Sequence, residues 1–421
     1  MMVTENMSPM HLSKAVEATG LFYDYYTGVY KSKNLVANEL QGLLRNFFEA
    51  RAYGCVELGW LPVGRKTAKY DVRYASAFSE FCAKNFGTLS INPVEKKLIT
   101  ALNFAEQMQH HANLKHRQTW DMLYHLIPST QQGQGIKTNF AFNPVIGRGQ
   151  RRSSVKYFPP EKILDLINAT DNLRDKLAFL LLFFGGLRLS EPLHIYVNDI
   201  TTPDGEAKIK IAHPESSNYS WNAPFIGNQT GQRSRFLLER YQLCPRNKLG
   251  LKNPFHAGWK GVLHTENTDE GGFYWLLPGI GNLFAKLHRQ YLHEFRAKID
   301  DKHPYYFVNL NEDQYGTPLK ISNLTKSFYR AAKRVGLSAS DPGVNPHGAR
   351  HFYGYFCASF LKLPIDKTQY MMRHAKISST QVYYTIDERV VRTELQKAHE
   401  RLNSDLPEFI KKLDKLAKNE H

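Results

Sequence analysis

Cysteine is scarce in this chain. The 421 residues include four, at Cys55, Cys82, Cys244 and Cys357, and no two of them form a Cys-x-x-Cys pair. This scattering excludes a disulfide framework and the usual cysteine-based zinc site. We therefore expect no metal site and no cofactor, and the composition fits the reducing cytoplasm.

Long apolar runs are also missing. The longest, Leu177 to Leu187, is too short to span a bilayer and is followed by Arg188, so it predicts a buried helix. The N-terminus does not show the basic start and apolar core of a signal peptide. We therefore expect a protein without membrane association.

Acidic residues are too few to balance the basic ones. Asp and Glu number 39 against 55 Lys and Arg, which gives a net charge of +16. Hydrophobic residues make up 42% of the chain, so it has the composition of folded domains. Its length predicts two or three such domains. A folded protein with this much positive charge is typical of one that binds nucleic acid.

The first part of the chain predicts helices. An amphipathic helix over Leu35–Ala50 lies in an N-terminal extra segment, residues 1–60. Residues 61–146 predict a compact all-α unit. Its expected helices are Lys66–Lys84, Pro93–His110 and about 114–126.

A basic linker follows at residues 147–156. It carries Arg148, Arg151, Arg152 and Lys156 and no acidic residue. A basic tether between two domains favours contact with a phosphate backbone, so these four residues are candidate DNA-binding residues.

The second part, residues 157–402, predicts a mainly α domain with a small β-sheet. We expect a β-like stretch over Ala207–Ala212, irregular chain over 213–270, and two strands at Trp259–His264 and Phe273–Leu277. The expected helices are 160–168, 173–184, 281–298, 321–335, 346–361, 364–372 and 378–400. A short basic helix, Leu406–Lys418, lies in the C-terminal segment 403–421.

Three short segments of this domain carry chemically useful residues. The first is Gly185-Gly186-Leu187-Arg188-Leu189-Ser190-Glu191, the second His347-Gly348-Ala349-Arg350-His351, and the third runs from His374 to Tyr384. Spacing of three puts His347 and Arg350 on one helical face, where both side chains can approach one ligand. Taken singly, each segment is equally consistent with ordinary salt bridges or packing.

Together and in this order, the three segments resemble the tyrosine recombinase (phage integrase) family. That family has Gly-Leu-Arg-x-Ser-Glu, then His-x-x-Arg-His, then a His or Trp with a Tyr nine residues later. Here Tyr383 lies nine residues after His374, which lies 24 after Arg350. The resemblance covers about 157–400 and implies a catalytic domain preceded by an all-α core-binding (SAM-like) domain.

The resemblance also implies roles for these residues. Tyr383 would attack the scissile phosphate and form a 3′-phosphotyrosyl link, with Tyr384 as the competing nucleophile. Arg188 and Arg350 would hold the non-bridging oxygens, supported by Glu191. His347 would exchange a proton with the tyrosine, His374 would hydrogen-bond the phosphate, and His351 would contact DNA.

The family's catalytic lysine, which protonates the leaving 5′-oxygen, has no clear match. If residues 213–258 are an insertion, Lys260 is the better candidate, whereas Lys210 lies on the earlier strand. The chemistry would need neither ATP nor a metal, because the phosphotyrosine conserves the bond energy.

The family implies a homo-tetramer on double-stranded DNA, joined through the C-terminal helix, with accessory DNA-bending or directionality factors. An integrase of a mobile element, working on the nucleoid in the cytoplasm, is the favoured function. Two alternatives remain: a type IB topoisomerase-like enzyme that shares the chemistry but relaxes DNA as a monomer, and a non-catalytic DNA-binding regulator on the same fold.

Overall fold

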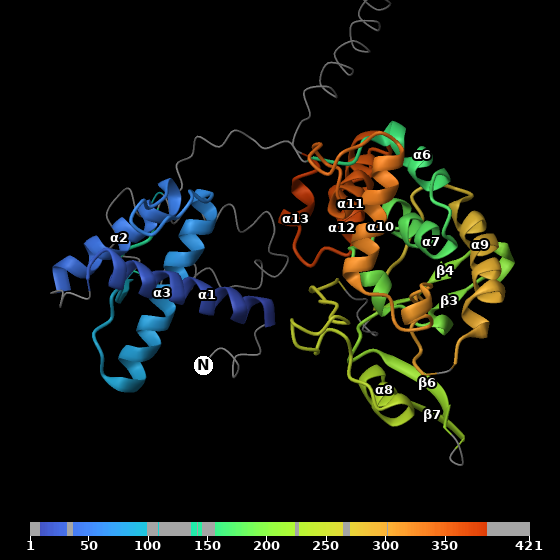
Figure 1. Ribbon diagram of the computed structural model, residues 1–421, viewed down its shortest axis with the longest axis horizontal. Coiled ribbons are helices and arrows are strands. Elements are labelled where there is room, and N and C mark those ends of the chain that lie inside the picture. The colour runs from blue at the N-terminus through green and yellow to red at the C-terminus, as the bar shows by residue number, and fades with distance from the viewer. Residues whose placement is uncertain are drawn as a thin grey trace, which may run out of the picture. The chain divides into compact units, whose positions relative to one another are not determined.

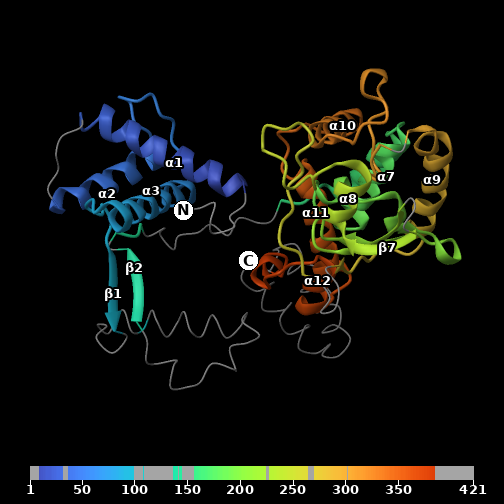
Figure 2. The ribbon, with the colours of Figure 1, turned by 90° about the horizontal axis from the view of Figure 1, so that it is seen from below.

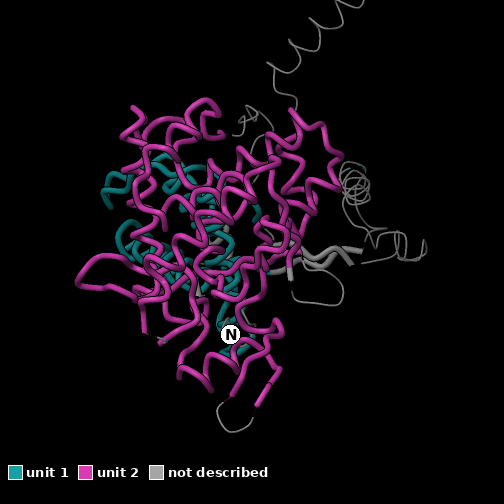
Figure 3. The backbone as a smooth tube through the Cα atoms, turned by 90° about the vertical axis from the view of Figure 1, so that its right-hand side faces the viewer, with its two compact units in different colours: residues 1–152 teal, residues 153–421 magenta. Residues whose placement is uncertain are grey.

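The structure, a computed structural model, is drawn in Figure 1. It describes residues 9–31, 37–98, 108, 136–140, 142–144, 156–223, 227–263, 270–300 and 302–384. The chain divides into two compact units, Met1–Arg152 and Ser153–His421 (Figure 3). Within the described residues, no helix has the length and apolarity that crossing a membrane requires.

Among the described residues of the first unit there are three long helices: α1 (Pro9–Gly28), α2 (Ala37–Tyr53) and α3 (Arg65–Phe86). Both α1 and α2 pack on α3, and the buried Arg51–Asp71 ion pair, at 2.9 Å, joins α2 to α3. The helices expected at Leu35–Ala50 and Lys66–Lys84 are confirmed as α2 and α3. The aromatic and aliphatic core of this unit consists of Tyr25, Leu43, Leu44, Phe47, Phe48, Ala52, Cys55, Ala68 and Val72.

A β-hairpin also belongs to this unit, so residues 61–146 are not all-α as predicted. The helix predicted over Pro93–His110 is wrong at Val94–Leu98, although Met108 is helical. β1 (Val94–Leu98) pairs antiparallel with β2 (Ile136–Phe140), and Figure 2 shows the two strands side by side. The buried Asn92 side chain donates to the Phe142 carbonyl and accepts from the Phe142 amide, which holds the base of the hairpin together. The partner strand is distant in sequence, so local spacing could not reveal it. The helix expected at 114–126 lies outside the described residues.

The second unit is built around α7 (Leu173–Phe184). The side chain of Asn172 accepts hydrogen bonds from the amides of Arg174 and Asp175, so the helix begins at Leu173. Every residue from Leu177 to Phe184 is buried, because helices pack around α7 on several sides. The surrounding helices are α6 (Ile163–Asn168), α9 (Ile280–Glu294), α10 (Ile321–Arg334) and α11 (Pro346–Tyr355).

The remaining helical elements are short. A π-helical turn, Phe356–Phe360, continues α11, and α12 (Ile365–Met371) and α13 (Ser378–Gln381) follow. These elements confirm the helices predicted across this domain as far as Gln381, where the helix predicted over 378–400 ends in a turn at Val382–Tyr384. The rest of that helix and the predicted Leu406–Lys418 helix lie outside the described residues. The 3-10 helices of this unit are Pro160–Lys162, Glu191–His194, Val197–Asp199, Pro203–Gly205, Arg296–Lys298 and Glu312–Gln314.

The small sheets agree only in part with the prediction. The β-like stretch is confirmed as β4 (Lys208–Ile209) and β5 (Ile211–Ala212), which pair with β3 (Ile200–Thr201) and β8 (Glu270–Gly271). The strands predicted at Trp259–His264 and Phe273–Leu277 are wrong. Only Val262 in these stretches makes a β-bridge, and its partner is His374.

Residues 213–270 are not uniformly irregular, contrary to our prediction. β6 (Asn218–Ala223) and β7 (Gly227–Gln232) form a hairpin, and α8 (Arg233–Tyr241) packs against it. Trp221 and Phe236 of this module share a small core with Tyr196 and Tyr305 of the main fold. The fold class is therefore mainly α with small β-sheets, as predicted.

Candidate active site

The glycine pair after α7 positions two arginines. The chain leaves the helix at Gly185 and turns through Gly186, whose φ of 61° is in the left-handed region that favours glycine. The Gly186 carbonyl accepts hydrogen bonds from Arg350 and, at 3.1 Å, from Arg373. Both guanidinium groups are therefore fixed at the end of the most buried helix of the unit.

Glu191 binds the same cluster from the other side. Its carboxylate lies 2.6 Å from Arg188 and 3.9 Å from both Arg350 and Arg373. Burial alone would raise the pKa of Glu191, but the three guanidinium charges outweigh burial and lower it. One negative and three positive charges leave an excess of two positive charges. Such an excess suits a phosphate group that gains negative charge during displacement.

Helix α11 presents the second motif. The Asn345 side chain accepts a hydrogen bond from the Gly348 amide, and Pro346 occupies the first helical position, so the helix begins just before His347. One turn separates His347 from His351, and their ring centroids are 4.3 Å apart. Burial and the neighbouring positive charges lower the pKa of His347 to about 4, so its ring is neutral at neutral pH.

Tyr383 lies inside this site. Its hydroxyl is 2.9 Å from Nδ1 of His351, and the side chain is buried. Burial raises the pKa of Tyr383 to about 12, although the charges of Arg350 and Arg188 oppose the increase. The ring fits because residue 354 is glycine: a Cβ there would come within 2.7 Å of the tyrosine ring. A phenol with this pKa needs a base before it can attack phosphorus.

Tyr384 is held elsewhere. Its hydroxyl donates to the backbone carbonyl of Leu363 and shares a second hydrogen bond with the hydroxyl of Thr368 on α12. Neither partner is one of the arginines or a residue of α11, so the geometry favours Tyr383 over Tyr384 as the nucleophile.

His374 belongs to the same group of side chains as Tyr383 and the arginines. It is buried, its ring stacks parallel to that of Tyr383 at 6.3 Å, and its Nδ1 is 2.9 Å from the Thr380 hydroxyl. Burial, then the charges of the arginines, lowers the pKa of His374 to about 2. With Nδ1 bound to Thr380, Nε2 is the nitrogen left for a ligand.

Lys260 lies beside this group. It is exposed, and its charge is one of those that lower the pKa of His347. The chain just after it is tied to the site, since Val262 bridges to His374 and the Leu263 amide donates to the Arg373 carbonyl at 3.3 Å. Lys210 interacts with a different group. Its positive charge affects the pKa of Asp199, the buried ion-pair partner of Arg233.

Sequence reasoning missed Arg373 and Thr380. Arg373 is fully buried and donates to the carbonyls of Gly185, Gly186 and Gly272 at 3.0–3.2 Å. Its position just before His374 was the available signal. Arg148, Arg151 and Arg152 of the linker lie outside the described residues, and Lys156 is exposed.

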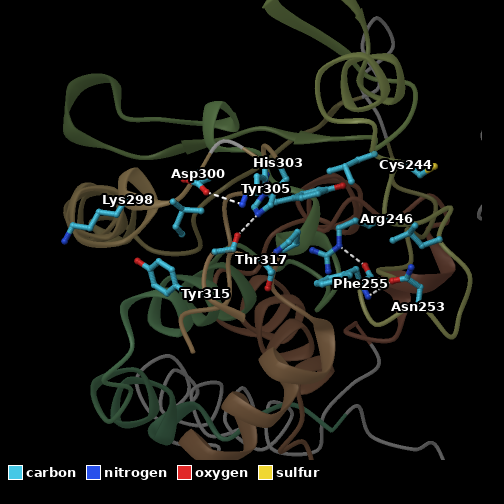
Figure 4. A pocket seen from close by; sticks show the side chains of 16 residues that line it. Cys244, Arg246, Asn253, Phe255, Lys298, Asp300, His303, Tyr305, Tyr315 and Thr317 are labelled. Atoms are coloured by element: carbon cyan, nitrogen blue, oxygen red, sulfur yellow. Dashed lines mark hydrogen bonds and ion pairs between the residues drawn. The ribbon is translucent and has the colours of Figure 1, made fainter. Parts of the chain in front are cut away.

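A separate hollow of about 550 Å³ lies between residues 243–255 and residues 298–318 (Figure 4). None of the residues of the tyrosine site lines it. Its buried cation, Arg246, already donates to the carbonyls of Phe255, Leu193 and Leu319. Because these carbonyls already occupy its guanidinium group, we assign Arg246 no part in binding a phosphate. Within the described residues, no three His, Cys, Asp or Glu side chains gather as metal ligands.

Comparison with known proteins gives distant relatives, and no family model matches the chain. The tyrosine recombinase XerA of Pyrococcus horikoshii is 24% identical over 276 residues, which are 63% of this chain and 71% of that protein. Transposase A of transposon Tn554 from Staphylococcus aureus is 21% identical over 255 residues, 60% of this chain. The matched region spans about half, 54%, of that transposase.

Solved structures of the same kind also align. The crystal structure of XerA recombinase aligns over 91% of this chain and 98% of its own, with 13% identity and a TM-score of 0.36. The Tn1549 transposon integrase in complex with circular intermediate DNA aligns over 90% and 99%, with 12% identity and a TM-score of 0.40. Both TM-scores lie below 0.5, so neither alignment is evidence for the function of this chain.

Proposed function

We propose that this chain belongs to the tyrosine recombinase family, which its similarity to XerA and to transposase A supports, and that it is a site-specific recombinase of a mobile genetic element. It cuts and rejoins double-stranded DNA through a 3′-phosphotyrosyl intermediate, without ATP or a metal. One observation carries the proposal: a buried tyrosine hydroxyl meets a neutral imidazole beside three arginines that share one carboxylate. The relatives favour neither the topoisomerase-like enzyme nor the non-catalytic regulator.

Each residue of the site has a proposed role. Tyr383 attacks the scissile phosphate, and Arg188 and Arg350 stabilise the charge on its non-bridging oxygens. Glu191 orients both arginines, since its carboxylate contacts each of them. His374 donates a hydrogen bond to the phosphate from Nε2. Removing one such donor from a displacement site typically slows the reaction about 10²- to 10³-fold.

The family resemblance assigns the proton exchange with Tyr383 to His347, and Lys260 protonates the leaving 5′-oxygen. Support for Lys260 over Lys210 comes from the effect of its charge on the pKa of His347 and from the backbone contacts of residues 262–263 with His374 and Arg373. An ammonium group beside the phosphate also attracts DNA.

The proposed organisation is a clamp around duplex DNA. It has an N-terminal extra segment at 1–60, a core-binding domain at 61–146, the basic linker at 147–156, the catalytic domain at 157–402 with its insertion at 213–258, and a C-terminal helix at 403–421. Arg148, Arg151, Arg152, Lys156 and His351 are its proposed DNA contacts. Four protomers assemble on two duplexes, joined through the C-terminal helix and aided by DNA-bending or directionality factors. The enzyme works in the cytoplasm on nucleoid DNA.

The test is recovery of the covalent intermediate. Protein expressed in cells is denatured, DNA that remains covalently attached is sequenced, and the recovered site is rebuilt as a nicked duplex from which the cleaved strand dissociates. We expect one defined junction sequence. After protease digestion, we expect a nucleotide to remain covalently attached to the peptide that contains Tyr383. DNA recovered without a common sequence, or attached to another residue, would contradict the proposal.

A further inference from the structure

The hydroxyl of Tyr383 has one hydrogen-bond partner among the described residues, and that partner is His351. The Tyr383 oxygen and Nδ1 of His351 are 2.9 Å apart. His347, to which the resemblance assigns proton exchange, stands one turn earlier on α11 and makes no such contact within the described residues. The nucleophile is therefore paired with the second histidine of the motif.

The protonation states of the two groups suit proton transfer. Burial, followed by the charge of Arg350, lowers the pKa of His351, so its ring is neutral at neutral pH and Nδ1 accepts the tyrosine proton. The Tyr383 phenol, with a pKa of about 12, does not ionise without help. The charged and titratable groups against His351 are Arg350 and His347 of its own helix and Tyr383 from the chain after α13.

The surroundings of His347 indicate a different task. The charges that act on it include those of Lys260 and Arg188, whereas the charge that acts on His351 is that of Arg350. His347 therefore lies on the side of the site that carries Lys260 and the half-buried Arg188. That side suits contact with the phosphate and the leaving group, and the opposite side suits contact with the nucleophile.

We propose that His351, rather than His347, is the catalytic base that removes the proton from Tyr383; this inference depends on the proposed recombinase function. As the Tyr383 oxygen bonds to phosphorus, its proton moves to Nδ1 of His351, which becomes an imidazolium. The bond from phosphorus to the 5′-oxygen breaks, and that oxygen takes a proton from Lys260. On rejoining, the 5′-hydroxyl attacks phosphorus and returns its proton to Lys260, while the departing tyrosine oxygen recovers its proton from His351.

The critical variant is His351→Asn. The Asn amide oxygen stands near the position of Nδ1 and can accept the tyrosine hydrogen bond, but it cannot take the proton. We expect covalent adduct formation on the recovered nicked duplex, measured at protein concentrations that saturate DNA binding, to slow about 10²- to 10⁴-fold. His347→Asn is the matched control on the same helix. If His351→Asn does not fold by circular dichroism, His351→Gln offers the same amide on a longer stem.

A second measurement identifies which step the base serves. Site-specific incorporation of 3,5-difluorotyrosine at position 383 gives a more acidic phenol, so it should restore most of the rate lost in His351→Asn and little of that lost in His347→Asn. A 5′-phosphorothiolate leaving group should not restore the cleavage rate of His351→Asn or His347→Asn. It should restore the rate only in a variant that lacks the acid, Lys260. Rescue of His347→Asn alone by the fluorinated tyrosine, or a wild-type rate in His351→Asn, would overturn the assignment. Wild-type protein that forms no adduct would instead refute the proposed function and, with it, this inference.

Discussion

The backbone of Gly186 lies directly against the ring of Tyr353. A Cβ built at Gly186 would come within 2.8 Å of the tyrosine Cγ, closer than carbon atoms approach without displacement. The Tyr353 hydroxyl in turn donates to the Tyr274 carbonyl at 3.0 Å, so the ring is held in place. The carbonyl that orients Arg350 and Arg373 therefore depends on the absence of a side chain at residue 186.

This relationship predicts the effect of Gly186→Ala. The left-handed φ costs alanine roughly 1–2 kcal/mol, and the clash with the Tyr353 ring adds to that cost. We expect the free energy of unfolding in urea to fall by more than the strain alone, and adduct formation to be lost because both arginines move. Gly279→Ala is the matched control, since Gly279 has a φ of 81° and no atom near the added Cβ. Equal losses of stability in Gly186→Ala and Gly279→Ala would show that the Tyr353 ring moves aside at no cost, which would contradict this prediction.

Sequence reasoning found the parts of this site that depend on local spacing. His347 and Arg350 share a face of one helix, and that helix begins where Asn345 and Pro346 predict. Arg188 and Glu191 are close in sequence and meet directly. Helical periodicity and capping act over a few residues, so a single sequence displays them.

The parts that depend on distant segments were not predictable in this way. The contact of His351 with Tyr383 joins residues far apart in sequence, and so does the bridge between Val262 and His374. β8 pairs with β5 across the whole insertion, which moved the strands away from the positions that composition suggested. The β6–β7 hairpin is rich in Asn, Gln and Gly, which disfavour strands, and its packing on α8 overrides that preference.

The nucleophile can be tested against its neighbour. Tyr383→Phe should abolish covalent adducts on the nicked duplex and leave DNA binding intact, because only the attacking oxygen is removed. Tyr384→Phe should still form adducts, since the Tyr384 hydroxyl is bound to Leu363 and Thr368. Adducts at the wild-type level in Tyr383→Phe, together with their loss in Tyr384→Phe, would reverse the assignment.

Cleavage should not depend on a divalent metal. The arginine cluster, with an excess of two positive charges over the Glu191 carboxylate, supplies the charge that stabilises the phosphate. We expect adduct formation to continue at the wild-type rate in excess EDTA, measured on the same nicked duplex. An EDTA-treated enzyme that regains activity only with magnesium would contradict this mechanism.

Stability should fall with acid through His194. Burial, then the charge of Arg246, lowers the pKa of His194 to about 3, against an ordinary value of 6.5. Between these pH values the unfolded chain binds a proton that the folded chain does not, so stability is present above pH 6.5 and is lost as the pH falls toward 3. One such proton changes the free energy of unfolding by about 1.4 kcal/mol per pH unit.

His194→Phe removes that proton and keeps a ring against Trp259. Urea unfolding followed by near-ultraviolet circular dichroism should therefore show a weaker loss of stability between pH 6.5 and 4.5 in His194→Phe than in the wild type. His293→Phe, at an exposed position of α9, should retain the wild-type profile. Superposable profiles of His194→Phe and wild type would show that His194 is protonated in the folded protein.

Lys260, the proposed acid, directly follows a residue that is held in place by packing. Trp259, beside it in sequence, packs edge-on against His194 at 5.3 Å and His213 at 5.8 Å, and this packing fixes the segment next to the site. A leaving 5′-alkoxide is a poor leaving group, so loss of a positioned acid should slow cleavage about 10²- to 10⁴-fold. A 5′-phosphorothiolate leaves with almost no need of a proton. Lys260→Ala should therefore cut ordinary DNA slowly and the sulfur-substituted DNA at close to the wild-type rate.

Matched variants separate this role from general damage to the site. Arg350→Ala and His347→Ala should gain no comparable rescue from sulfur, because their proposed contacts are with other atoms of the phosphate. Lys210→Ala should cut both DNAs at the wild-type rate, since the charge of Lys210 falls on Asp199 rather than on the tyrosine site. If Lys260→Ala cuts ordinary DNA as fast as the wild type and Lys210→Ala shows the sulfur rescue, the acid lies on β4–β5. The ties of residues 262–263 to His374 and Arg373 would then serve only to hold the insertion in place.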